Sequence, residues 1–161
     1  MTKNNNYKEA DDKTISLHVA ILGHEDLVAI SKLCKEGADV NAKDEHGRNA
    51  LMFAAAVGNL AAIKYFIKRG ADVNEKDNDG WTAVMKAAIR GHKEAVALLC
   101  QYGADVNAKD NNGKTVFDDK YLSPEMRNYL NSPWDSPEKR EVSDRLIDKM
   151  IACKQMFDQI N

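Results

Sequence analysis

The chain has 161 residues, enough for one compact domain or a short repeat array and too few for two full-sized domains with separate cores. Its 23 basic and 25 acidic residues leave a formal net charge of −2, which argues against a single-sign field that would recruit nucleic acid or an anionic membrane. No apolar stretch approaches the ~20 residues of a membrane-spanning helix, so we expect neither nucleic acid nor a membrane as a partner.

Residues 1–11 are polar and lack the apolar stretch of roughly 7–15 residues that a secretory signal requires. We expect a flexible N-terminal tail here. The three cysteines, Cys34, Cys100 and Cys153, lie far apart in the sequence and form no CxxC pair. These features predict reduced thiols and a cytoplasmic, intracellular protein.

From residue 12 onward the chain contains a repeated motif. The run Gly-Ala-Asp-Val-Asn occurs three times at intervals of 33 residues, beginning at Gly37, Gly70 and Gly103. A second set of glycines keeps the same interval and closes Asp-x-x-Gly tetrads, at Gly47, Gly80 and Gly113. Aspartate at the first and glycine at the fourth position favour a type I turn. We expect the asparagines that end the longer motif to hydrogen-bond to neighbouring turns.

Two apolar-periodic stretches separate the turns, for example residues 50–57 and 60–69, and each predicts a helix of two or three turns. Asn49, Thr82 and Thr115 precede the first helix of each pair and can cap it through their side-chain oxygens. Small residues in the first helices allow close stacking. A single turn–helix–helix unit cannot bury its own apolar surface, so the units must pack against one another.

This pattern resembles the ankyrin repeat, whose hallmarks are a Thr-Pro-Leu-His-x-Ala helix start, a Gly-His turn and a Gly-Ala-Asp-Val-Asn ending. The starts here read Asn49-Ala-Leu-Met-Phe-Ala54 and Thr82-Ala-Val-Met-Lys-Ala87, so proline is absent and methionine replaces histidine. His24 and His92 match the Gly-His turn. The resemblance covers about residues 12–131 and implies an all-α solenoid of helix–turn–helix units with hairpin loops.

We divide the matching region into four units, which are an N-terminal cap repeat at 12–43, full repeats at 44–76 and 77–109, and a truncated C-terminal cap repeat at 110–131. In the last unit we expect Thr115 to start one helix and Ser123 to start the second, with a proline at its first helical position. Residues 132–136 are predicted to form a linker, because the prolines at 133 and 137 interrupt a helix.

An extra amphipathic helix is predicted at 137–161, outside the resemblance. Its apolar residues recur at spacings of three or four, at Val142, Leu146, Met150, Cys153, Phe157 and Ile160. Such an exposed apolar face is a liability on a monomer. We therefore expect the helix to fold back and cover the open end of the solenoid, and pairing with a second copy or with another chain is the alternative.

Several fragments imitate catalytic or metal-binding motifs but fail. Gly113-Lys114-Thr115 resembles the end of a P-loop, yet Ala108 stands where that motif needs glycine. The sequence from Glu75 to Gly80 resembles a calcium loop, yet Lys86 stands where it needs glutamate. The four histidines lack HExxH spacing, and the cysteines occupy apolar positions. We expect no catalytic residue, no cofactor and no bound metal.

The resemblance implies instead a partner-binding surface, made of the turn tips and the exposed face of the first helices. By position, its residues are Glu45, His46, Arg48, Phe53, Val57, Asn78, Asp79, Trp81, Lys86, Ile89, Arg90, Asn111, Asn112 and Lys114. Trp81 is the strongest candidate, because tryptophan dominates interface hot spots. It can also simply pack on the adjacent hairpin.

The function predicted is therefore a protein–protein interaction module that binds one protein partner through a concave groove and catalyses nothing itself. A second hypothesis is an assembly or regulatory subunit that acts through the helix at 137–161. A third is an enzyme-modulating ankyrin protein, or an effector delivered by a bacterium or pathogen. We expect a monomer, with a homo-oligomer through that helix as the alternative.

Overall fold

The computed structural model describes residues 12–23 and 27–132, together with residues 137, 139, 141, 142, 144 and 145. Over these residues the chain is helical and contains no strand. The elements in chain order are α1 (Asp12–Leu22), α2 (Leu27–Lys35), α3 (Ala50–Val57), α4 (Leu60–Lys68), α5 (Ala83–Ile89), α6 (Lys93–Gln101), the 3₁₀ helix η1 (Val116–Asp118) and α7 (Pro124–Asn131). The predicted all-α repeat fold is confirmed.

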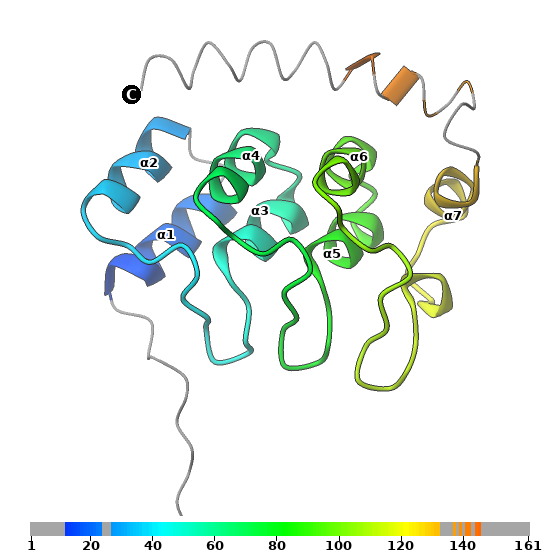
Figure 1. Ribbon diagram of the computed structural model, residues 1–161, viewed down its shortest axis with the longest axis horizontal. Helices are drawn as coiled ribbons and strands as arrows, with labels where there is room; N and C mark the ends of the chain where they lie inside the picture. The colour runs from blue at the N-terminus through cyan, green and yellow to red at the C-terminus, as the bar shows by residue number, and fades with distance from the viewer. Residues whose placement is uncertain are drawn as a thin grey trace, which may run out of the picture.

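The helices form two rows. α1, α3 and α5 lie side by side as the first helices of successive repeats, and α2, α4 and α6 form a second row, drawn above the first in Figure 1. The long hairpin loops project together from one edge (Figure 1). Small residues permit the close approach within the first row, since Ala54 and Ala55 on α3 and Ala87 and Ala88 on α5 are all buried.

The core lies between the two rows and runs the length of the array. On α4 the residues Ile63 and Phe66 are completely buried, and Val96 and Leu99 take their place on α6 with at most 1% exposed. Each helix pair buries its apolar face against the next pair. The buried apolar residues that the structure describes form one continuous cluster, as expected for a solenoid.

The N-terminal caps differ between repeats. The side-chain oxygen of Asn49 accepts a hydrogen bond from the backbone amide of Met52 (3.0 Å), as predicted. The cap predicted at Thr82 is wrong, because the buried hydroxyl of Thr82 forms no hydrogen bond in the described structure. At Thr115 the carboxylate of Asp118 accepts from both the amide and the hydroxyl (2.9 Å each), and only a three-residue 3₁₀ helix follows.

The Gly-His turn holds neighbouring repeats together. Gly58 has φ = 71°, and a Cβ atom there would stand 2.7 Å from the His92 ring of the next repeat. Nε2 of the His92 ring lies 3.1 Å from the carbonyl oxygen of Ala56. His92 is thus engaged in the contact between α3 and the turn before α6. His24, the other predicted Gly-His turn residue, lies outside the described residues.

The described part of the C-terminal segment is helical and contacts both the last repeat and α6 of the repeat before it. Val142 is completely buried and Lys139 is 4% exposed. The Lys139 ammonium donates to the carbonyl of Ser132 (2.6 Å) and lies over the Tyr129 ring, while Arg145 pairs with Glu94 of α6 (3.8 Å). Leu146 and the rest of the predicted apolar face, like the tail at 1–11, lie outside the described residues.

Candidate functional site

A groove of about 510 Å³ crosses the first helices of the two full repeats. It is lined by Leu22, Arg48, Met52, Phe53, Ala56, Trp81, Lys86, Ile89, Arg90, Asp119 and Tyr121. Its residues come from α1, α3, α5 and the loops before and after them. The stacking of the repeats therefore brings together side chains that are far apart in sequence.

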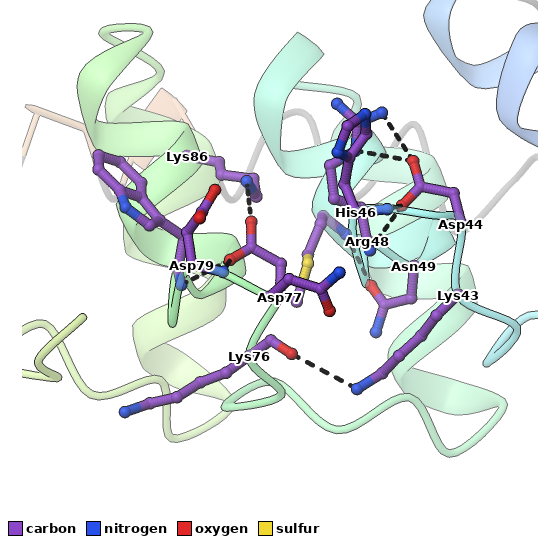
Figure 2. Close-up of polar contacts among 12 residues, drawn as sticks. Lys43, Asp44, His46, Arg48, Asn49, Lys76, Asp77, Asp79 and Lys86 are labelled. Atoms are coloured by element: carbon purple, nitrogen blue, oxygen red, sulfur yellow. Dashed lines mark hydrogen bonds and ion pairs between the residues drawn. The ribbon is translucent and has the colours of Figure 1, made fainter. Parts of the chain in front are cut away.

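The turn aspartates position the cations beside this groove. In the second repeat the carboxylate of Asp44 accepts from the backbone amides of His46 (3.0 Å) and Arg48 (2.8 Å). Its second oxygen pairs with the Arg48 guanidinium at 2.6 Å (Figure 2). Burial disfavours ionisation of Asp44, but the hydrogen bonds and charge of Arg48 outweigh burial and lower the pKa of the carboxyl.

The third repeat uses the same type of turn but takes its cation from elsewhere. Asp77 accepts from the amide of Trp81 (2.8 Å), and its second oxygen pairs with the Lys86 ammonium at 2.6 Å (Figure 2). Lys86 comes from α5 and not from the turn itself. The pair is well shielded, since the Asp77 side chain is only 4% exposed.

Cation and aromatic ring exchange places between these two repeats. Position 48 holds arginine and position 53 phenylalanine, whereas the equivalent positions 81 and 86 hold tryptophan and lysine. In both repeats the cation lies over the ring, at 4.9 Å for Arg48 over Phe53 and 5.8 Å for Lys86 over Trp81. Each repeat thus presents one cation–aromatic pair to the groove, with the cation neutralised by its turn aspartate.

Arg90 differs from these two cations. It ends α5, is exposed, and has no ion-pair or hydrogen-bond partner among the described side chains. Asp119 of the following repeat is the acidic residue of the lining. Its side chain accepts a hydrogen bond from the backbone amide of Tyr121 (2.7 Å). Arg90 is therefore a groove cation that remains available to an external carboxylate.

The structure distributes the predicted partner-binding residues over three places. Six line the groove, namely Arg48, Phe53, Trp81, Lys86, Ile89 and Arg90. Asn112 and Lys114 line a second hollow of about 340 Å³ on the other side of Trp81, which contributes to both. The other six, Glu45, His46, Val57, Asn78, Asp79 and Asn111, line neither hollow.

Two asparagines at the hairpin tips form hydrogen bonds to the preceding repeat. The Asn78 side-chain amide donates to the carbonyl of Glu45 (2.9 Å), and that of Asn111 donates to the carbonyl of Asn78 (2.7 Å). The backbone amide of Asn78 also donates to the carbonyl of His46 (2.9 Å). These bonds join the tips of successive repeats, so the two amides serve the array itself.

Apart from Ala56, which adjoins the predicted Val57 at the end of a first helix, sequence reasoning missed four lining residues, Leu22, Met52, Asp119 and Tyr121. Leu22 precedes Ala56 by 34 positions, so the one-residue length difference of the first unit hides its equivalence. Asp119 follows Lys86 by 33 positions and could have been found by register. Tyr121 has no equivalent, because the last repeat departs from the helical pattern after η1.

The two described cysteines are unsuited to nucleophilic catalysis. Burial raises the pKa of the Cys34 thiol, although a hydrogen bond with Tyr65 opposes this. Burial also raises the pKa of Cys100 to about 11, against the opposing charge of Lys139. Both thiols are protonated at neutral pH, and a protonated thiol is a poor nucleophile. Cys153 lies outside the described residues.

The described part of the chain shows two further features that bear on function. No group of three or more His, Cys, Asp or Glu side chains within it is arranged to hold a metal ion. None of its helices has the length and apolar character needed to cross a membrane.

Comparison with protein families matches residues 17–110 to ankyrin repeats, in three copies. No curated protein matches the chain. The matched region is more than half of the 161 residues, and it coincides with the stacked helix pairs and projecting hairpins described above. The chain therefore belongs to the ankyrin-repeat family.

Proposed function

We propose that this protein binds a protein partner in the groove formed by α1, α3 and α5, without a reaction of its own. Ankyrin repeats are generally protein–protein interaction modules and are typically non-catalytic. The observation that carries the proposal is the groove, which joins an apolar floor to one available cation, Arg90. The free thiols of Cys34 and Cys100 agree with a cytoplasmic protein.

The lining favours a particular chemistry in the partner. The floor contains buried Phe53 and half-buried Ile89, and the ends carry Leu22 and Tyr121, which are 48% and 69% exposed. Exposed apolar side chains of this kind suit an apolar segment of a partner. Because Arg48 and Lys86 already pair with turn aspartates, Arg90 is the cation that would receive a partner carboxylate.

The proposal is tested by identifying the partner and then measuring its affinity for matched variants. A pull-down from the native organism with mass spectrometry supplies the candidate, and calorimetry with the purified pair gives the dissociation constant. We expect Trp81→Ala and Arg90→Glu each to weaken binding by about 10-fold or more, since both side chains line the groove.

Two substitutions outside the groove lining serve as controls. Tyr102→Ala removes an aromatic ring that is 38% exposed, and Lys109→Glu reverses an exposed cation near the hairpin tips. Both are expected to bind as the wild type does. Circular dichroism and melting confirm that all four variants fold. If both groove variants bound the partner with the dissociation constant of the wild type, the groove would not be the binding site.

The C-terminal segment supports a second, structural role. We infer that residues 137–161 cap the last repeat, because the described residues Lys139 and Val142 are buried and the Lys139 ammonium lies over the Tyr129 ring of α7. This favours capping over dimerisation through the same helix, since a side chain buried within one copy is withheld from another. The roles of enzyme modulator and of delivered effector stay predictions from the family resemblance.

A further inference from the structure

The first repeat ends the array with an apolar surface. Of the large hydrophobic residues that the described structure exposes, four belong to α1 and α2: Ile15 (50%), Val19 (62%), Leu22 (48%) and Val28 (50%). Leu22 lines the partner groove. The others surround a separate hollow of about 450 Å³ between α1 and α2, or lie close to it in sequence. We call the surface made of Ile15, Val19, Val28, Lys32, Leu33 and Glu36 the end face.

The opposite end of the array has a different character. On α7 the apolar residues Met126 and Tyr129 are 1% exposed and Leu130 is half-buried, and the exposed residues are Pro124, Glu125, Asn128 and Asn131. Repeat arrays need a polar outer face on their terminal repeats to stay soluble. The helix α7 follows this rule while α1 and α2 do not, so the end face has the composition of an interface between repeats.

The shape of the end face also matches an internal interface. α1 and α2 pack with their other sides on α3 and α4, as helix pairs do throughout the array (Figure 1). The hollow between α1 and α2 is lined by apolar Ile15, Val19, Ala20, Ala29 and Leu33. Such a surface accepts a second helix pair.

The charges of the end face indicate which helix pair fits. Lys32 and Glu36 both line the hollow and stand one helical turn apart, with 75% and 48% of their side chains exposed. They form only a loose pair at 3.9 Å, which contributes little to stability at this exposure. One positive and one negative residue on the same patch make the patch complementary to itself, which is the condition for a twofold interface.

We propose that two copies of this chain associate through the end face, α1 and α2 of one copy against α1 and α2 of the other. Lys32 of each copy then lies beside Glu36 of the other, around the apolar contacts of Ile15, Val19 and Val28. The dimer carries two partner grooves facing outward from a common centre. This interface is distinct from the partner groove and from the helix at 137–161.

The first test is the mass of the full chain in solution, measured by light scattering and sedimentation. Over about 1–300 µM, a range that spans weak protein interfaces, we expect a concentration-dependent dimer. Val19→Asp should weaken it roughly 100-fold, because an unpaired carboxylate replaces a central apolar contact. Val19 is 62% exposed, so the variant keeps its fold.

The matched control is Tyr121→Asp, which places the same charge at a more exposed apolar position on the groove. It should dimerise as the wild type does. A wild type that stays monomeric throughout overturns the proposal. If the wild type is monomeric and Val19→Asp also lowers the melting temperature, the proposal is overturned and the chain itself covers the end face.

A charge exchange tests whether the occupant is a second copy. Lys32→Glu alone sets glutamate against glutamate, and Glu36→Lys alone sets lysine against lysine, so each variant should dimerise more weakly than the wild type. An equimolar mixture of the two should restore the dimer, because both glutamates of the first variant then meet lysines of the second. A mixture no more dimeric than its components would contradict the twofold arrangement. Groove binding is measured separately, so failure here leaves the proposed function standing.

Discussion

Asn49 and Thr82 occupy the same register position but contribute differently. The Asn49 side chain caps α3 by accepting from the Met52 amide, whereas the Thr82 hydroxyl is completely buried and forms no hydrogen bond in the described structure. A buried hydroxyl without a partner loses its hydration and gains nothing in return. We therefore expect removal of the polar group to lower the free energy of unfolding at Asn49 but not at Thr82.

Asn49→Ala should lower the free energy of unfolding by about 1 kcal/mol, the usual cost of losing an N-terminal cap. Thr82→Val keeps the shape and removes the hydroxyl, so it should change stability by less than about 0.5 kcal/mol or increase it. Urea denaturation of both variants measures the difference. An equal loss in both would mean that Thr82 caps α5 after all.

His18 predicts a dependence of stability on pH. Burial lowers the pKa of its imidazole below the ordinary value of 6.5, with a smaller opposing effect from Asp44 and a further lowering by Arg48. The unfolded chain therefore binds this proton more readily than the folded chain. Stability that is complete above pH 6.5 is lost as the pH falls below it, by at most about 1.4 kcal/mol per pH unit.

Urea denaturation at about pH 7.5 and pH 5.5 tests this linkage. His18→Leu should remove the contribution of His18 to the change in the free energy of unfolding with pH. Identical slopes in the wild type and His18→Leu would refute the assignment.

At the scale of elements, the bounds of the paired helices agree closely with those predicted from the sequence. The structure of the last repeat and of the segment after it depends instead on contacts with other parts of the chain. The helices predicted at 50–57 and 60–69 end within one residue of α3 and α4. The helix predicted to begin at Thr115 shortens to η1, because Asp118 closes its first turn and α7 begins soon afterwards. The following segment reaches the core through Val142.

Val142→Asp should destabilise the chain by about 3 kcal/mol, since it places an unpaired charge in the core. Glu141→Ala, at the exposed neighbouring position, should change stability by less than about 0.5 kcal/mol. Thermal melting of both variants checks this. If the Val142 variant melted like the wild type, the segment would not cap the last repeat.

At the scale of the whole molecule, polar bonds between hairpin tips supplement the apolar core. Asn78 and Asn111 tie each tip to the preceding one. Nearby, the Asn74 side chain donates to the carbonyl of Gly103 (3.0 Å) and accepts from the amide of Asp105 (2.9 Å), which confirms the predicted role of this motif asparagine. Coupling between repeats makes an array unfold as one unit.

Asn78→Ala should weaken this coupling, with a loss of about 1 kcal/mol and a broader unfolding transition. Asn112→Ala is the matched control, because the Asn112 side chain interacts with Asp110 of its own turn. Denaturation followed by circular dichroism and by tryptophan fluorescence reports on the transition. Two variants of equal stability and cooperativity would show that the inter-tip bonds contribute nothing.

Part of the groove could be read from register alone. Arg48 and Trp81 stand 33 positions apart, as do Phe53 and Lys86, and a fixed period places equivalent residues on one face. The same reasoning extends to Leu22 and Asp119 once the first unit's extra residue is counted. Tyr121 could not be found in this way, because the last repeat is irregular.

The sequence by itself determined the repeat, the helix pairs and the family, because local periodicity and turn glycines depend on neighbours within a few residues. Only the tertiary structure decided which charges are used up. Asp44 takes Arg48 from its own turn while Asp77 takes Lys86 from a helix, and Arg90 is left available. Only the stacked structure revealed the apolar end face on α1 and α2, since exposure depends on which surfaces other parts of the chain cover.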